Sequence, residues 1–72
     1  MFKIGILGAG IIAAQHKDAI VKHPKAELAA VCDIDMSKAE KCAEGTNAAV
    51  YADFKEMADK ESLDAVIINL PH

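Results

Sequence analysis

The sequence contains no arginine and no tryptophan, and only two of its 72 residues are cysteines. Cys32 and Cys42 form no Cys-x-x-Cys pair and have no histidine close in sequence, so we predict neither a metal site nor a cysteine nucleophile. The eight lysines alternate with eleven acids and form no basic patch, which argues against nucleic acid as a partner. No stretch reaches the roughly 20 apolar residues of a membrane span. We therefore expect a cytoplasmic domain with reduced thiols and a mildly acidic, mixed surface.

The hydrophobic fraction is high for so short a chain. It amounts to 53% of the residues, whereas a complete soluble domain has about 45–50%. A small protein has proportionally more surface and buries only about 60% of what its unfolded chain exposes. The excess therefore predicts that some of the apolar surface packs against a partner outside these residues. Among the large apolar side chains, Phe54 and Met57 are assigned to the core.

Short apolar runs alternate with longer stretches of helical periodicity. Pro24 ends the first helical stretch, because the residue before a proline is pushed out of the helical region. The second helix starts at Asp35 or Ser37, and Gly45 stands where a left-handed residue is needed to end it. The predicted strands cover residues 2–7, 28–32, 48–51 and 65–68, and the predicted helices cover 11–22, 35 or 37 to 45, and 53 onward.

The predicted element order is β-α-β-α-β-α-β, which is typical of a parallel sheet with right-handed crossovers. We therefore predict an α/β fold, a Rossmann-type doubly wound parallel sheet with strand order 3-2-1-4. A complete dinucleotide-binding sheet of this kind has about six strands. We interpret residues 1–72 as a truncated N-terminal part of such a domain. We also expect self-association through the open edge of the strand at residues 65–69.

The stretch from Gly8 to Ala13 reads Gly-x-Gly-x-x-Ala between the first strand and the first helix. Gly8 permits the tight turn, Gly10 lets the backbone approach a pyrophosphate, and Ala13 lets the helix pack closely on the sheet. The first N–H groups of the helix have no intrahelical acceptor and favour an anion. A packing role alone is the alternative for such a turn. The predicted cofactor-binding residues here are Gly8, Gly10, Ile11, Ile12 and Ala13.

Asp33 directly follows the second predicted strand and lies twenty positions after Ala13, the place where dinucleotide-binding folds carry an acid. Its carboxylate can accept hydrogen bonds from both hydroxyls of the adenosine ribose and would repel a 2′-phosphate. NAD is therefore the expected cofactor, with NADP as the alternative. Asp33 can also be interpreted as a residue that only ends the strand or, with Asp35, starts the next helix; Asp35 fits that second role better.

Several stretches resemble the Gfo/Idh/MocA family of oxidoreductases, named for glucose–fructose oxidoreductase and inositol dehydrogenase. The turn itself is common to Rossmann proteins, whereas the Tyr-x-Asp-Phe helix start and the Asp-Ala-Val-Ile-Ile strand ending in proline are more diagnostic. Together they cover nearly the whole chain. The matching stretches are 8–13 with His16, 31–35, 51–57 and 63–72.

This resemblance implies an NAD(P)-dependent oxidoreductase that transfers a hydride to or from a sugar, cyclitol or related polyol. It also implies that the segment 69–72 passes beside the dinucleotide, so Asn69, Leu70 and Pro71 are expected to line the cofactor. The family's second domain forms the substrate site and has no counterpart in residues 1–72. The Glu-Lys-Pro segment that supplies the family's catalytic lysine is also missing, so no residue here is assigned a catalytic role. We accordingly expect the 72-residue chain by itself to be inactive, and the alternative function is a non-catalytic dinucleotide-sensing or regulatory module.

Overall fold

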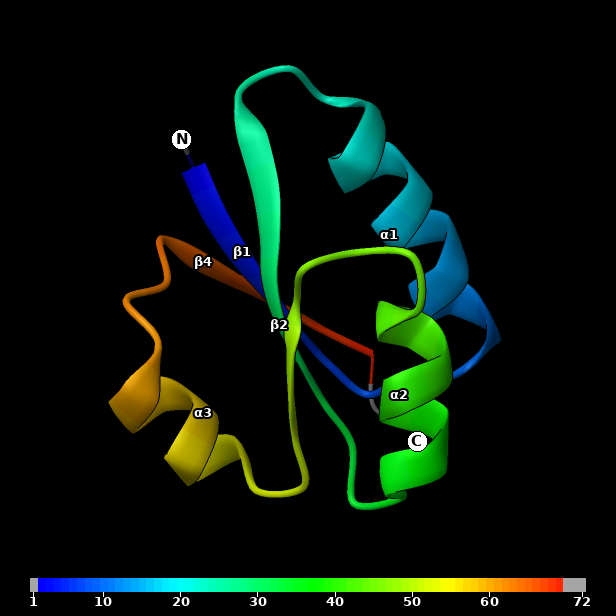
Figure 1. Ribbon diagram of the computed structural model, residues 1–72, viewed down its shortest axis with the longest axis vertical. Helices are drawn as coiled ribbons and strands as arrows, with labels where there is room; N and C mark the ends of the chain where they lie inside the picture. The colour runs from blue at the N-terminus through cyan, green and yellow to red at the C-terminus, as the bar shows by residue number, and fades with distance from the viewer. Residues whose placement is uncertain (1, 70–72) are drawn as a thin grey trace.

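The computed structural model describes residues 2–69, apart from the side chains of Ile11 and Ile12. Within this range strands and helices alternate along the chain as the sequence predicts (Figure 1). The elements are β1 (Phe2–Leu7), α1 (Ile11–Lys22), β2 (Ala26–Cys32), α2 (Met36–Ala43), β3 (Ala49–Tyr51), α3 (Phe54–Lys60) and β4 (Ala65–Ile68).

The four strands form one parallel sheet in the order β3-β2-β1-β4, which confirms the predicted order. The register of β1 against β2 shifts between Ile4 and Gly5, because Ile4 pairs with Leu28 while Gly5 pairs with Ala30. Ala29 is thus an extra residue, as in a β-bulge. The bulge explains why Leu28 and Val31, three residues apart, belong to the same buried cluster.

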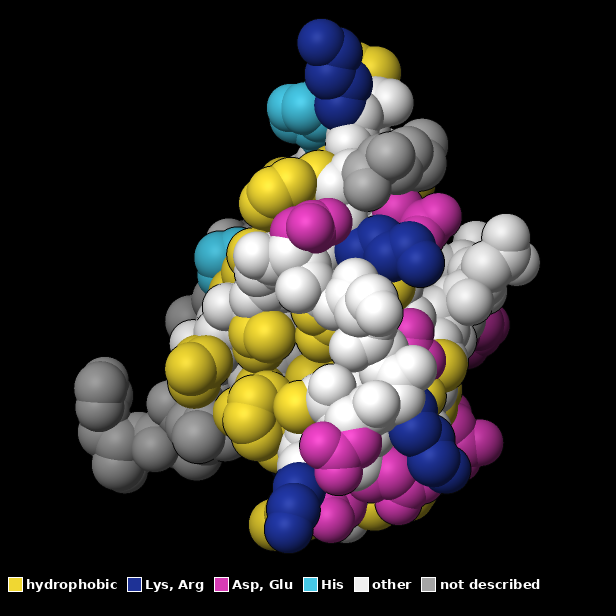
Figure 2. Space-filling view, turned by 90° about the vertical axis from the view of Figure 1, so that its left-hand side faces the viewer, with side chains coloured by type: hydrophobic (Ala, Val, Ile, Leu, Met, Phe, Trp, Pro, Cys, Tyr) yellow, Lys and Arg dark blue, Asp and Glu magenta, His cyan; other side chains and the backbone are white. Residues whose placement is uncertain are grey.

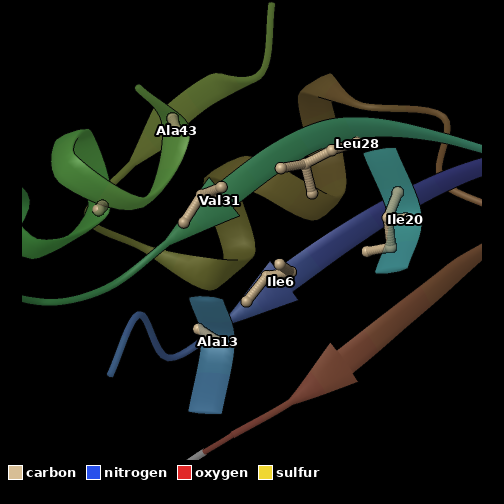
Figure 3. Close-up of a cluster of buried hydrophobic side chains, with 7 residues drawn as sticks. Ile6, Ala13, Ile20, Leu28, Val31 and Ala43 are labelled. Atoms are coloured by element: carbon tan, nitrogen blue, oxygen red, sulfur yellow. The ribbon is translucent and has the colours of Figure 1, made fainter. Parts of the chain in front are cut away.

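Helices cover both faces of the sheet (Figure 1). α1 and α2 lie together over one face, and α3 lies over the other, against β2 and β3. Between the sheet and the first pair of helices is the main core, whose side chains approach one another from strands and helices (Figure 3). Its buried members are Ile6, Ala13, Ile20, Leu28, Val31, Ala39 and Ala43.

The helix boundaries follow local signals near each end. α1 ends at Lys22, two residues before Pro24, and Gly45 has a φ of 82° in the left-handed region, both as predicted. Asp35 is the N-cap of α2, and its side chain accepts the N–H of Ser37 at 3.1 Å. The helix therefore begins from the first of the two starts that the sequence leaves open, Asp35.

The second, smaller core contains Ala30, Cys32 and Met57. Met57 is fully buried and fastens α3 to the sheet, as predicted. The prediction for Phe54 was wrong: this first residue of α3 remains 42% exposed. α3 has seven residues, about two turns; Met57 in its middle is buried against the sheet, whereas Phe54 stands at its N-terminal end.

The outer edge of β4 has no strand beside it within residues 2–69. β4 pairs with β1 alone, and Ile68 at its end is 64% exposed. Figure 2 shows the side of the molecule that carries β4 and α3, where hydrophobic side chains gather at the surface.

We predict that Met57→Ala lowers the free energy of unfolding by about 2–5 kcal/mol, because it empties a fully buried site that α3 needs for packing. Phe54→Ala is the matched control on the same helix and should cost about 1 kcal/mol or less. Urea unfolding followed by circular dichroism measures both changes. Equal losses from the two variants would contradict this assignment of the core.

Candidate cofactor site at the carboxyl edge of the sheet

The carboxyl ends of β1, β2 and β4 bring the predicted site residues to one edge of the sheet. Parallel strands all end on the same side, and backbone hydrogen bonds hold the residues that follow them at one level. The N–H of Gly8 donates to the carbonyl of Cys32 at 2.8 Å, and the N–H of Asn69 donates to the carbonyl of Leu7 at 2.7 Å. The structure thus places the Gly8 turn, Asp33 and Asn69 next to one another.

Gly8 turns the chain out of β1 with a φ of 95°. This left-handed conformation is rare for any residue with a Cβ, so the backbone itself demands glycine here. The tight turn predicted from the sequence is present, and it delivers the chain directly into α1.

Gly10 is a glycine for a different reason. It is the N-cap of α1 with φ −81° and ψ −164°, a conformation open to other residues. A Cβ added there would meet no described protein atom within 4 Å. Neither backbone strain nor packing within the described part of the chain requires glycine, so the space above Gly10 remains open to the close approach of a ligand.

The start of α1 suits an anion. Gly10 provides no side-chain cap, and no acidic residue occupies the first turn of the helix. The N–H groups at a helix start lack intrahelical acceptors, and the helix dipole adds partial positive charge there. Ile11 and Ile12 contribute backbone to this first turn. Ala13 is fully buried in the main core with Ile6, which brings α1 close to the sheet (Figure 3).

Asp33 reaches back to the glycine turn through its side chain. Its Oδ2 accepts the N–H of Ala9 at 2.8 Å, and its Oδ1 accepts the N–H of Asp35 at 2.9 Å. Since Asp35 is the cap of α2, Asp33 is not the residue that starts this helix. A carboxylate offers about four acceptor positions, so each oxygen retains one for a further donor. The contact with Ala9 joins positions 24 residues apart and was not foreseen from the sequence.

Asn69 lies beside the turn with its side chain half-buried. Its Nδ2 atom is buried and has no hydrogen-bond partner among the described residues. A buried donor without an acceptor is costly, so an acceptor group supplied by a ligand would satisfy it. Leu70 and Pro71, the other two residues expected to line the cofactor, lie outside the described residues.

Two further groups border the site. Burial, followed by the negative charges of Asp53 and Asp33, raises the pKa of the Cys32 thiol, which keeps it in the unreactive protonated form. The carbonyl of Tyr51 accepts the N–H of Asp33 at 3.1 Å, so the end of β3 supports the acid from the other side.

A surface hollow lies at the opposite edge of the sheet from the glycine turn, lined by residues at the amino ends of the strands. Within residues 2–69 no three histidine, cysteine or acidic residues are grouped to hold a metal ion, and no helix is long and apolar enough to cross a membrane. The hollow is lined by Phe2, Ile4, His23, Lys25, Ala26 and Asp64.

Residues 2–72 match the Gfo/Idh/MocA family, described as an oxidoreductase family with an NAD-binding Rossmann fold. The chain belongs to this family. The match covers nearly the whole sequence, and it agrees with the resemblance, fold and cofactor predicted above. The open space at Gly10, the carboxylate beside the turn and the orphan amide of Asn69 fit a dinucleotide.

Curated relatives and solved structures agree with this placement. The chain is 35% identical to inositol 2-dehydrogenases from Arthrobacter sp. (strain FB24) and Renibacterium salmoninarum, over 96% and 94% of its length. Both matches span only 21% of the relative. The chain thus corresponds to about a fifth of these longer proteins.

Among solved structures, the chain is similar to myo-inositol dehydrogenase from Lactobacillus casei in complex with NAD(H) and myo-inositol. The TM-score is 0.88 at 32% identity, over 96% of this chain and 21% of that one. WlbA dehydrogenase from Bordetella pertussis, solved with NADH and UDP-GlcNAcA, gives a TM-score of 0.90 at 27% identity, over 97% and 22%. These relatives are dehydrogenases and lend no support to the alternative of a purely regulatory module.

Tyr51 generates a prediction about pH, because its hydroxyl donates a 2.5 Å hydrogen bond to Glu61 Oε2 and this bond raises the pKa of Tyr51 to about 12 from 10.0. The neutral hydroxyl is favoured in the folded chain. Its contribution to stability is therefore complete below about pH 10 and is lost as the pH rises to about 12.

Tyr51 is the single tyrosine and there is no tryptophan, so the ultraviolet absorbance of tyrosinate reports this group alone. We expect a titration near pH 12 in the folded chain and near pH 10 in urea. Glu61→Gln should shift the folded value back toward 10.0. A folded chain that titrates like the urea-unfolded one would contradict the prediction.

Proposed function

We propose that this chain is the cofactor-binding part of an oxidoreductase that transfers a hydride between a nicotinamide cofactor and a sugar, cyclitol or related polyol. In this proposal residues 1–72 form the N-terminal part of an NAD(P)-binding Rossmann domain. The remainder of that domain and a substrate domain belong to a longer protein. The dehydrogenases named above, of which the chain matches about a fifth, support this arrangement.

The observation that carries the proposal is the contact between Asp33 and Ala9. It places a carboxylate with free acceptor positions directly beside a glycine turn that leads into an uncapped helix start. We propose that the pyrophosphate of the cofactor binds at Gly10 and at the first residues of α1, Ile11 and Ile12. Gly8 makes the turn that presents them, and Ala13 holds the helix close to the sheet. The 2.8 Å contact between Ala9 and Asp33 keeps the turn and the carboxylate beside each other, as adjacent phosphate and ribose groups of one nucleotide are.

In this proposal the Asp33 carboxylate accepts hydrogen bonds from the hydroxyls of the adenosine ribose. A 2′-phosphate would meet its negative charge, and the chain has no arginine to bind such a group. We therefore propose NAD rather than NADP as the preferred cofactor. Asn69, with its orphan Nδ2, is proposed to line the cofactor at the end of β4. Leu70 and Pro71, the next two residues of the sequence, are proposed to line it as well.

The bound nicotinamide would supply the hydride chemistry, and the residues of this chain would bind and orient it. Gly10 admits the pyrophosphate, the start of α1 stabilises its charge, and Asp33 sets the position of the ribose. The segment that supplies the family's catalytic lysine and the family's substrate domain have no counterpart in residues 1–72. We therefore expect no turnover of polyols by the 72-residue chain alone.

The sharpest test is Gly10→Ala. Because the added Cβ meets no described protein atom within 4 Å, the variant should fold, and its free energy of unfolding in urea should fall only by the about 1 kcal/mol or less that alanine costs at an N-cap. The methyl group instead occupies the space proposed for the pyrophosphate. The affinity for NAD, measured by isothermal titration calorimetry, should fall about tenfold or more, which is about 1.4 kcal/mol or more. Wild-type chain that fails to bind NAD, or equal affinity in the variant, would refute the proposal.

We also propose that the 72-residue chain self-associates through the open edge of β4. An unpaired parallel edge with an exposed Ile68 can pair with a second copy. Light scattering should show a mass that rises with concentration, and Ile68→Lys should reduce it because edge lysines oppose strand pairing. A constant monomer mass in the wild-type chain would contradict this proposal.

A further inference from the structure

We propose that Asp33 is also a positioning residue: its carboxylate holds the glycine turn in the shape that binds phosphate. This inference rests on the proposed function for the ligand, but its structural part concerns the chain alone. Asp33 would then act on two neighbouring groups of the cofactor. It would bind the ribose directly, and it would shape the turn that binds the pyrophosphate.

Two consecutive N–H groups of the turn are tied to the end of β2. The first, from Gly8, donates to the backbone carbonyl of Cys32 and continues the pairing of β1 with β2. The second, from Ala9, has a side chain as its acceptor, Asp33 Oδ2 at 2.8 Å. The shape of the turn after Gly8 therefore depends on the identity of the residue that follows β2.

The other oxygen of Asp33 is held as well, by the N–H of Asp35 at 2.9 Å. The carboxylate is thus fixed between the turn and the cap of α2, and two of its roughly four acceptor positions are used. One acceptor position per oxygen remains, which matches the two hydroxyls of a ribose. Positioning the turn and binding ribose are therefore compatible in the same side chain.

The arrangement also assigns the N–H groups of the turn. The N–H of Ala9 is taken by Asp33 and is not available to a phosphate. The pyrophosphate is left with the N–H of Gly10 and the start of α1, where no acid lies in the first turn. Because Asp33 occupies the N–H of Ala9, the N–H groups that remain for the ligand are those of Gly10 and of the first turn of α1.

Asparagine cannot replace the carboxylate in this role. Asp33→Asn keeps the size and shape of the side chain, but one of its two oxygens becomes an NH₂ group, which is only a donor. That donor must face the N–H of either Ala9 or Asp35, so one of the two contacts is lost. The neutral variant also removes a negative charge close to the proposed phosphate position.

These two effects predict opposite signs for a ligand that lacks the ribose hydroxyls, and dideoxy-ADP is such a ligand. If Asp33 only bound ribose, the affinity of Asp33→Asn for dideoxy-ADP would equal that of the wild-type chain or exceed it, because the variant lacks a charge that repels phosphate. If Asp33 positions the turn, a variant that loses the contact with Ala9, such as Asp33→Ala, binds dideoxy-ADP more weakly, by about threefold or more, because the preorganised turn is lost.

The experiment measures ADP and dideoxy-ADP affinities by calorimetry on the full 72-residue chain and follows amide hydrogen exchange of Ala9 without ligand. Asp33→Ala is measured beside Asp33→Asn, because alanine removes both contacts whereas asparagine can keep its single oxygen on Ala9. In Asp33→Ala we expect Ala9 to exchange about tenfold faster or more, together with the weaker dideoxy-ADP binding. Asp53→Asn is the matched control. Asp53 follows the neighbouring strand, β3, and caps α3, a role that asparagine also fills, so both readouts should stay unchanged.

Unchanged exchange at Ala9 in Asp33→Ala would overturn the inference, and so would unchanged or tighter binding of dideoxy-ADP by that variant. If the wild-type chain binds neither ADP nor dideoxy-ADP, the proposed function fails, and the exchange of Ala9 alone decides the positioning role. Should Asp33→Ala not fold, a through-hydrogen-bond coupling between the Ala9 nitrogen and the Asp33 carboxyl carbon decides it in the wild-type chain. Its detection by nuclear magnetic resonance supports the contact, and its absence overturns it.

Discussion

The pairing of β1 with a parallel strand on each side is the constraint on which the candidate site depends. Leu7, the last residue of β1, is in register with Cys32 of β2 and Ile68 of β4. The three neighbouring strands therefore end at the same level, and the residues that follow them, Gly8, Asp33 and Asn69, lie close together. Parallel pairing requires that each connection return along the sheet, which is the task of the helices in between. A slip in either register would move the glycine turn away from Asp33 or Asn69.

Glycine serves three different physical purposes around this edge. Gly8 supplies a backbone conformation that a Cβ disfavours, and Gly10 keeps a space that the described protein atoms leave open. Gly5, inside β1, makes room for Leu63, since a Cβ there would lie 2.7 Å from Leu63 Cδ1 and the end of that side chain would have to shift. Only the purpose of Gly10 points outward to a ligand. The recognition chemistry of the site is thus concentrated in backbone groups, with Asp33 and Asn69 as the polar side chains beside them.

Local chemistry explains why much of the fold could be predicted. The alternation of apolar runs with helical stretches, the stop at Pro24 and the left-handed Gly45 all act within a few residues. The strand order then follows from the limited ways in which such units pack. The boundary of β2 was less accurate: it begins at Ala26, because Ala26 and Glu27 pair with the start of β1, a contact that the polar Glu27 conceals in the sequence.

The sequence by itself determined the class of fold, the order of the strands and the residue types at the turn and after β2, because periodicity, caps and glycine conformation are properties of short segments. Tertiary structure alone decided that Asp33 holds the N–H of Ala9 and that Phe54 stays exposed while Met57 is buried. It also decided that the Asn69 Nδ2 donor has no acceptor among residues 2–69. Each of these depends on atoms from segments far apart in the chain. Their distances are set only when the sheet brings the segments together, and no spacing along the sequence encodes them.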